Sequence, residues 1–220
     1  MTDESSPREP EQDEACARCR KPPELCVCSA VTPISTSRQV LILQHPREPD
    51  KELGSAIVAH LALPGSTLRV GLSWPNLAAA LGRPADPKRW LVLYLGSVQP
   101  RRGEPGSGSL MFVDRRGAPR RSDRAALAAI SGVVALDGTW SQAKSLWWRN
   151  AWLLKLQRAV LAPGEPSLFR QLRREPRRDS LSTLEALALT LADLEGRPEM
   201  VDEMLRPFRK LLAAARRHTR

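Results

Sequence analysis

Residues 132–136, Gly-Val-Val-Ala-Leu, form a continuous apolar run that ends at Asp137. A strand that is apolar on both faces has to be covered on both sides, which is typical of the interior of a parallel sheet. Thr139 and Gln142 follow with the spacing of a capping box, so we expect a helix over residues 140–149. This strand–turn–helix unit predicts an α/β domain.

The other segments of the chain alternate in the same way. We expect further strands and helices, the strands over residues 40–44, 68–72, 90–95 and 157–162 and the helices over residues 51–63, 76–82, 122–130, 183–195 and 199–217. The last helix has an apolar stripe that consists of Met200, Met204, Phe208, Leu211 and Leu212. The pattern therefore predicts a mostly parallel sheet flanked by helices.

The length of 220 residues fits one domain with a small appendage. No apolar run approaches the roughly 20 residues that a bilayer-spanning helix needs. The first 14 residues are acidic, unlike a signal peptide, and contain nothing to bury, so we expect a disordered tail there. We expect a soluble, cytoplasmic protein with no membrane partner and no obligate protein partner.

Basic residues are concentrated beyond the N-terminal segment. The chain has 34 Lys and Arg against 24 Asp and Glu, a net charge of +10, and residues 29–220 alone have 30 bases against 17 acids. Twenty-eight of the bases are Arg, whose planar guanidinium group matches phosphate and stacks on nucleobases. The composition favours an RNA partner, although a GC-rich genome would also enrich Arg.

Four cysteines lie within thirteen residues: Cys16, Cys19, Cys26 and Cys28. Their spacing presents two pairs of sulfurs to one point and fits a tetrahedral zinc site. Two disulfides or a redox pair are the alternatives, and a reducing cytoplasm disfavours disulfides. Because four thiolates leave no open position on the metal, such a zinc ion is structural. It either fixes the N-terminus to the domain or helps to bind RNA.

Asp137 stands at the end of the apolar strand. Ligands of α/β sheets bind outside the carboxyl ends of the strands, and Gly138 allows a close backbone approach. Asp137 fits either a ligand site or a simple helix cap, and the spacing alone does not separate the two. Trp147, Trp148 and Trp152 follow, and because they cannot share one helix face we expect at least one at a ligand or RNA surface.

Four motifs follow one another along the chain. They are Cys16-x-x-Cys19 with Cys26-x-Cys28, then Leu43-Gln44-His45-Pro46-Arg47-Glu48, then Asp137-Gly138-Thr139-Trp140, and finally Arg173-Arg174-Glu175-Pro176 with Leu181-Ser182-Thr183-Leu184-Glu185-Ala186. In this order they resemble the DTW-domain family of tRNA-uridine aminocarboxypropyltransferases. The resemblance extends over residues 16–195.

The resemblance implies a fold similar to the SPOUT class, an α/β sheet whose C-terminal segments form a trefoil knot around the cofactor. Knots are otherwise rare, and the strand pattern alone does not predict one. The expected organisation is then a disordered acidic tail over residues 1–14, a four-cysteine zinc-binding element over residues 15–30, and a SPOUT-like DTW catalytic domain over residues 31–220.

The resemblance also implies a reaction. The family transfers the 3-amino-3-carboxypropyl group of S-adenosylmethionine to N3 of a uridine in tRNA and releases methylthioadenosine. The protein has to turn one of the three carbons on the sulfonium toward the nucleophile, which is a positioning problem. Asp137 is the expected catalytic residue, as general base for the N3 proton, and burial would help it by raising its pKa.

Three loops at strand ends are expected to bind S-adenosylmethionine. Their residues are Tyr94, Leu95, Gly96, Ser97, Leu136, Gly138, Thr139, Trp140, Leu181, Ser182 and Thr183. Ser182 and Glu185 also have capping-box spacing, so Ser182 fits a helix cap as well as a ligand role. The expected substrate-binding residues are His45, Arg47, Arg173, Arg174, Arg177 and Arg178. His45 fits a structural role equally, and the arginine cluster fits a solvated loop.

Two other functions are compatible with the same residues. A SPOUT-type RNA methyltransferase would use the same cofactor but release S-adenosylhomocysteine. A non-catalytic, zinc-containing RNA-binding protein would bind tRNA without regard to S-adenosylmethionine, and it would leave Asp137 without a role.

Overall fold

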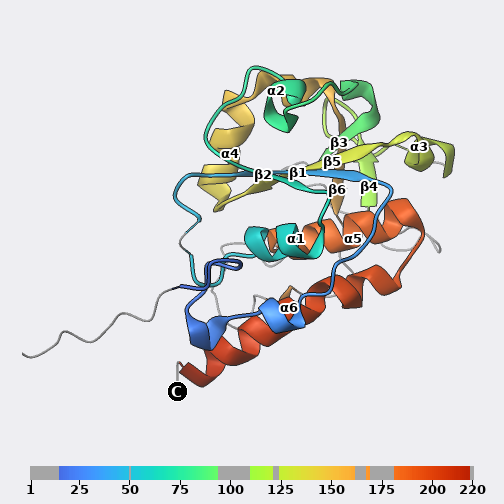
Figure 1. Ribbon diagram of the computed structural model, residues 1–220. Coiled ribbons are helices and arrows are strands. Elements are labelled where there is room, and N and C mark those ends of the chain that lie inside the picture. Colours follow the sequence, from blue (N-terminus) through green and yellow to red (C-terminus); the bar gives the residue numbers. More distant parts are fainter. Residues whose placement is uncertain are drawn as a thin grey trace, which may run out of the picture.

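The computed structural model describes residues 15–49, 51–93, 110–120, 124–161, 167–168 and 181–218. A six-stranded sheet runs through the middle of the molecule (Figure 1). Its strands are β1 (Gln39–Gln44), β2 (Thr67–Val70), β3 (Trp90–Leu93), β4 (Leu110–Val113), β5 (Gly132–Asp137) and β6 (Gln157–Leu161). Their order is β2-β1-β5-β3-β6-β4, and every pair is parallel except β4 with β6. The prediction of an α/β fold with a mostly parallel sheet is confirmed.

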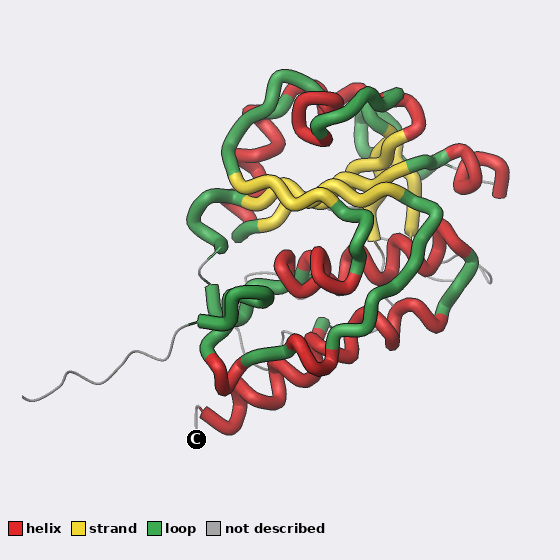
Figure 2. The backbone as a smooth tube through the Cα atoms, viewed as in Figure 1, coloured by secondary structure: helices red, strands yellow, loops and turns green. Residues whose placement is uncertain are grey.

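Helices cover both faces of the sheet (Figures 1 and 2). On one face lie α2 (Leu77–Leu81) and α4 (Trp140–Arg149), and on the other lie α1 (Ala56–Ala62) and α5 (Thr183–Glu195). The long helix α6 (Glu199–His218) packs on α5 on the side away from the sheet and reaches the N-terminal cysteine segment, whereas α3 (Arg124–Ala129) precedes β5. Four short 3-10 helices complete the described elements: η1 (Pro23–Leu25), η2 (Cys28–Ala30), η3 (Pro87–Arg89) and η4 (Ala151–Lys155).

The alternation of side chains along the strands explains the two cores. In β1, Val40 and Ile42 join the core on the α1/α5 face, whereas Leu41 and Leu43 join the core on the α2/α4 face. All four side chains are essentially inaccessible to solvent. Successive side chains of a strand point to opposite faces, so a strand between two helical layers must be apolar throughout.

Three elements differ from the sequence-based expectation. The strand expected over residues 68–72 is β2, which spans Thr67–Val70 and ends before the bend at residues 71–72. Helix α1 begins only at Ala56, because residues 51–54 form turns in which the Gly54 amide donates to the Lys51 carbonyl at 2.8 Å. Strand β4 was not expected, and it adds an antiparallel edge to β6. The expected helices at 140–149 and 183–195 are confirmed at both ends, and Gly196 ends α5 in the left-handed conformation. The expected acidic tail lies outside the described residues.

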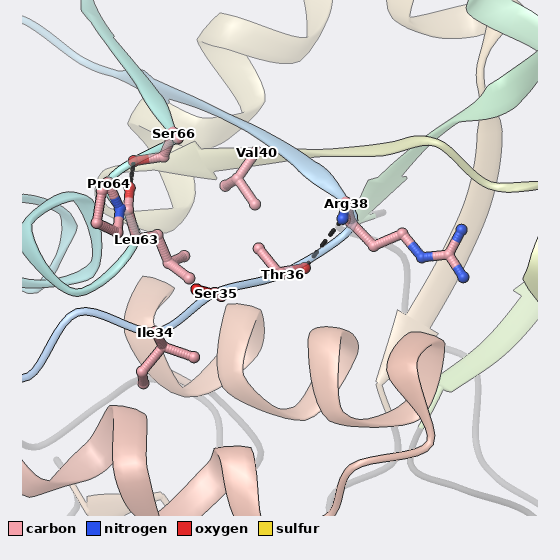
Figure 3. Close-up of a pocket in the computed structure, with 9 residues that line it drawn as sticks. Ile34, Ser35, Thr36, Arg38, Val40, Leu63, Pro64 and Ser66 are labelled. Carbon is pink, nitrogen blue, oxygen red and sulfur yellow. Dashed lines mark hydrogen bonds between the residues drawn. The ribbon is translucent and has the colours of Figure 1, made fainter.

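A hollow of about 220 Å³ opens at the amino end of β1 (Figure 3). Ile34 and Leu63 line it, and the Arg38 amide beside it donates to Thr36 Oγ1 at 3.0 Å. This hollow lies at the opposite end of β1 from Gln44, which pairs with Asp137. It is therefore separate from the carboxyl edge of the sheet, where ligands of such folds bind.

Candidate functional site

Asp137 lies at the carboxyl edge of the sheet, directly opposite Gln44 in the β1–β5 register. Its carboxylate accepts two hydrogen bonds, from Gln44 Nε2 to Oδ2 at 2.9 Å and from Thr183 Oγ1 to Oδ1 at 2.5 Å. The side chain is only 7% exposed. Burial raises the pKa of Asp137, and the hydrogen bonds from Thr183 and Gln44, together with the positive charge of Lys21, oppose that rise only in part. The site thus holds a desolvated, proton-accepting carboxylate.

The turn after Asp137 requires glycine. Gly138 has a φ of +152°, and a Cβ atom there would lie 2.9 Å from Gln142 Cβ. Thr139 then caps α4, with its Oγ1 accepting from the Gln142 amide and its own amide donating to Gln142 Oε1 at 2.5 Å. The predicted capping box is therefore confirmed. It fixes the direction in which α4 leaves the site.

The N-terminus of α5 reaches the same carboxylate. Thr183 is its first residue, and Ser182 caps it by accepting the Glu185 amide at 3.2 Å. The Glu185 carboxylate accepts in return from the Ser182 amide at 2.8 Å and from Ser167 Oγ at 2.8 Å. The side chain of Ser182 is thus engaged in helix initiation, whereas the Thr183 hydroxyl contacts Asp137 directly.

Lys21 is a functional candidate that the sequence reasoning missed. Its side chain is fully buried, and its Nζ donates to the Lys51 carbonyl in the β1–α1 loop at 2.7 Å. Burial lowers the pKa of Lys21 to about 8, against the opposing charges of Cys19, Asp137 and Glu52. A lysine between two cysteine pairs and next to prolines looks like a surface turn in the sequence. In the structure it brings an ammonium group from the cysteine segment toward Asp137.

The loop after β1 contains the predicted His45 and Arg47. The His45 amide continues the sheet by donating to the Asp137 carbonyl at 3.0 Å, and its Nδ1 accepts the Arg47 amide at 3.2 Å. Arg47 is exposed. Glu48, which was not predicted, is 8% exposed, and among the described residues none donates a hydrogen bond to its buried Oε1. Buried carboxylate oxygens normally accept a hydrogen bond, so this oxygen is able to accept one from a ligand.

The four predicted cysteines come together. Their sulfurs all lie within 4.8 Å of one another, with 3.7 Å between Cys16 and Cys28 and 3.8 Å between Cys19 and Cys26. A tetrahedron with zinc–sulfur bonds of about 2.3 Å has sulfur–sulfur edges of about 3.8 Å, whereas a disulfide bond is about 2.05 Å long. All four are free cysteines. The donor set and its spacing therefore fit a tetrahedral metal ion.

The thiols of the cluster differ in their pKa values. Burial and a hydrogen bond with Cys16 raise the pKa of Cys28 to about 12, while backbone hydrogen bonds from Cys19 and Arg18 lower the pKa of Cys16 to about 6. Four crowded sulfurs cannot all become thiolates unless a cation balances their charge.

Several predicted site residues lie outside the described residues. They are Tyr94, Leu95, Gly96, Ser97, Arg173, Arg174, Arg177 and Arg178. Of the predicted residues that the structure describes, Leu136 and Trp140 flank the Asp137 turn, and Leu181 precedes the cap of α5. The structure thus brings the 136–140 and 181–183 loops together around one carboxylate.

Comparison with known proteins identifies the family of this chain. Residues 13–216 match the DTW domain. The chain belongs to the DTW-domain family. It is 33% identical over 209 residues to tRNA-uridine aminocarboxypropyltransferase 2 of Drosophila melanogaster, a match that covers 92% of this chain and 75% of the fly protein.

Two mammalian relatives are more distant. The proteins of the same name from Macaca fascicularis and Mus musculus are 26% and 27% identical, and each match covers 98% of this chain but 66% of the relative. No solved structure matches this chain significantly. Among the described residues, no helix is long and apolar enough to cross a membrane.

Proposed function

We propose that this DTW-domain protein transfers the 3-amino-3-carboxypropyl group of S-adenosylmethionine to N3 of a uridine in tRNA and releases methylthioadenosine. The observation that carries the proposal is the buried carboxylate of Asp137, whose pKa is raised, at the carboxyl edge of the sheet. Its relatives are named for this transfer to tRNA uridine. A non-catalytic RNA-binding protein has no need for such a carboxylate.

The reaction needs little beyond positioning and one proton acceptor. A bond forms between uridine N3 and the transferred carbon while the bond from that carbon to sulfur breaks, and the N3 proton has to leave. Asp137 accepts this proton as general base. A raised pKa makes its carboxylate a stronger acceptor, and the hydrogen bonds from Gln44 and Thr183 hold it in one orientation.

The residues around Asp137 fit the amino-acid end of the donor. When bound, S-adenosylmethionine supplies an electrophilic carbon next to its sulfonium, and that carbon chain ends in an ammonium and a carboxylate. The buried Glu48 Oε1 has no hydrogen-bond donor within the part of the chain that the structure describes, which fits an ammonium donor. Within the described ranges Lys21 donates to the Lys51 carbonyl alone, so its remaining N–H groups fit a carboxylate. The loops at residues 94–97, 136–140 and 181–183 would hold the rest of the donor.

The cysteine segment completes the site. We assign it a structural zinc ion, because all four positions around the metal are filled by Cys16, Cys19, Cys26 and Cys28. Its role is to hold Lys21 in place beside the β1–α1 loop. Free cysteines persist in a reducing compartment, so we place the reaction in the cytoplasm.

The finer fold assignment is part of the same proposal. We assign residues 31–220 to a SPOUT-like domain whose C-terminal segments form a trefoil knot around the donor. Strand β3 lies between β6 and β5 in the sheet. After β6 the chain therefore passes back across β3, so that Thr183 contacts Asp137 at the end of β5, and such a crossing supports this assignment. We assign tRNA binding to His45, Arg47 and the cluster Arg173, Arg174, Arg177 and Arg178.

Two isotopically labelled donors test the reaction. The wild-type protein is incubated with unmodified tRNA and with S-adenosylmethionine labelled either in the carboxyl carbon or in the methyl group. Carboxyl label in the tRNA, with the methyl label in released methylthioadenosine, is the expected result. Methyl label in the tRNA would instead make the protein an RNA methyltransferase.

A further inference from the structure

Charges are divided unevenly between the two sides of the sheet. The segments that build the α2/α4 side, residues 67–89 and 138–158, contain eight Lys and Arg and a single acid, Asp86. Residues 181–218, which form α5 and α6 on the other side, contain six bases and six acids. Residues 15–38, which lie on the same side as α6, add four bases and one acid, so the net charge is +3 there and +7 on the α2/α4 side. The larger positive charge of the α2/α4 side favours a polyanion there.

Helix α4 carries an exposed tryptophan on this side. Its inner face packs into the core through Leu146 and Trp147, whereas Trp148 is 77% exposed. Lys144 lies one turn before Trp148 and Arg149 follows it, and both are exposed. Lys144 shares the helix face of Trp148, whereas Arg149 donates from Nε to Ser145 Oγ at 3.4 Å on the neighbouring face. The indole can stack on a nucleobase while the two cations contact phosphates on either side.

The position of Trp148 is fixed by the structure around it. The Ser73 hydroxyl donates to the Arg149 carbonyl at 3.1 Å. The Asn150 side chain accepts the Trp74 amide at 2.9 Å and donates to the Leu72 carbonyl at 3.0 Å. The end of α4 is thus tied to the loop after β2, which holds in place the backbone that carries the Trp148 indole.

Helix α4 also connects Trp148 to the catalytic residue. Its cap, Thr139, lies two residues after Asp137, and Trp148 lies about 13 Å farther along the helix at 1.5 Å per residue. The Asp137 carboxylate faces α5 through Thr183, so an RNA strand that contacts both residues has to pass over the carboxyl edge of the sheet from Asp137 to Trp148. This connection relates the exposed aromatic to the substrate and not only to solvent.

We propose that the outer face of α4, formed by Lys144, Trp148 and Arg149, binds the single-stranded part of the tRNA that flanks the target uridine, with a base stacked on the Trp148 indole. This inference rests on the proposed function and adds to it the surface that holds the substrate. It assigns sequence-tolerant binding to this face, because every base has a stacking surface.

The test compares three variants by filter binding to unmodified tRNA. Trp148→Ala is expected to weaken binding by roughly 5- to 150-fold, the usual effect of losing one stacked base. Trp148→Phe keeps an aromatic face and is expected to retain most of the affinity. Leu154→Ala removes another exposed apolar side chain, 48% exposed on η4, and is expected to bind like wild type. Calorimetric binding of S-adenosylmethionine should be the same in all three.

Three outcomes would overturn the inference. Wild-type tRNA affinity in Trp148→Ala, while the wild-type enzyme modifies tRNA, would remove this surface and leave the proposed function standing. Unchanged tRNA affinity with a loss of dimers in sedimentation would make Trp148 a protein–protein contact. Equal losses in Trp148→Ala and Leu154→Ala would show a general effect on the fold. A wild-type protein that neither binds nor modifies tRNA would refute the proposed function itself.

Discussion

Replacing Asp137 by Asn separates the chemistry of the site from its architecture. Asn has the same shape, but one of its two terminal atoms is an NH₂ donor instead of an acceptor. Both hydrogen bonds can still form, because either the Thr183 hydroxyl or the Gln44 side-chain oxygen can accept from this NH₂ group. The substitution removes only the ability to take a proton. We therefore expect donor and tRNA binding to persist while the transfer is lost.

The magnitude follows from the role of a general base. Such groups contribute about 10²- to 10⁴-fold to the rate, which corresponds to roughly 3–5 kcal/mol in the activation barrier. In wild type the rate should rise with pH as Asp137 ionises, and the midpoint should lie above the ordinary aspartate pKa of about 3.9, because burial raises it. Asp137→Asn should lose this acidic limb.

The effect on stability has the opposite sign. An acid whose pKa is raised on folding contributes its stability fully below its unfolded pKa, and this contribution is lost as pH rises through the folded value. At neutral pH the buried negative charge of Asp137 therefore lowers the free energy of unfolding of the wild type. The Asn side chain of the variant carries no charge, so the variant does not have this loss. We expect Asp137→Asn to be at least as stable as wild type at pH 7, with the difference shrinking below about pH 4.

Single-turnover assays with tRNA and thermal unfolding across pH measure both effects. Asp86→Asn is the matched control, because this exposed aspartate only caps η3 through the Lys88 amide and should change nothing in the transfer. Transfer by Asp137→Asn within about tenfold of wild type, or unfolding at a markedly lower temperature at pH 7, would refute the reasoning.

Three further substitutions or treatments probe the neighbours of Asp137. Gln44→Leu removes a hydrogen bond that lowers the pKa of Asp137, so the acidic limb of the pH–rate profile should move to higher pH; an unmoved limb would exclude this coupling. In calorimetry, wild type and the exposed control Lys51→Met should bind S-adenosylmethionine about tenfold or more tightly than its decarboxylated form. Lys21→Met should bind the two ligands equally, because it lacks the ammonium group that contacts the carboxylate. Equal loss of affinity for both ligands would show a purely structural role. We expect the purified protein to contain one zinc ion per chain, and removing it with a chelator should lower the melting temperature. An unchanged melting temperature would argue against a structural zinc.

Much of the fold follows from local sequence signals. The apolar run at β5 fixes the buried, parallel centre of the sheet because its two faces need cover. The capping residues Thr139 and Ser182 set the starts of α4 and α5, and glycines at 82 and 196 end α2 and α5 with positive φ. These features depend on neighbours in the chain, so the sequence alone suffices.

The site could be predicted only where one motif contains both partners. The four cysteines are predicted as a metal site from their spacing, whereas Asp137 is singled out by its place after the apolar strand and its catalytic role is expected only from the family resemblance. The hydrogen bond between Gln44 and Asp137, 93 residues apart, depends on the register of two strands. The buried positions of Lys21 and Glu48 depend on which segments cover them, and a charged residue in a proline-rich turn is normally exposed. The edge strand β4 is short, and its antiparallel pairing with β6 has no local signal.

The central claim is that the site around Asp137 attaches an aminocarboxypropyl group to uridine. Mass spectrometry of nucleosides and small-molecule products, after incubation of wild type and Asp137→Asn with S-adenosylmethionine and unmodified tRNA, tests it most directly. We expect a uridine heavier by one aminocarboxypropyl group and released methylthioadenosine with wild type, and neither with the variant. A methylated nucleoside with S-adenosylhomocysteine, or the same modified uridine from both proteins, would contradict the account.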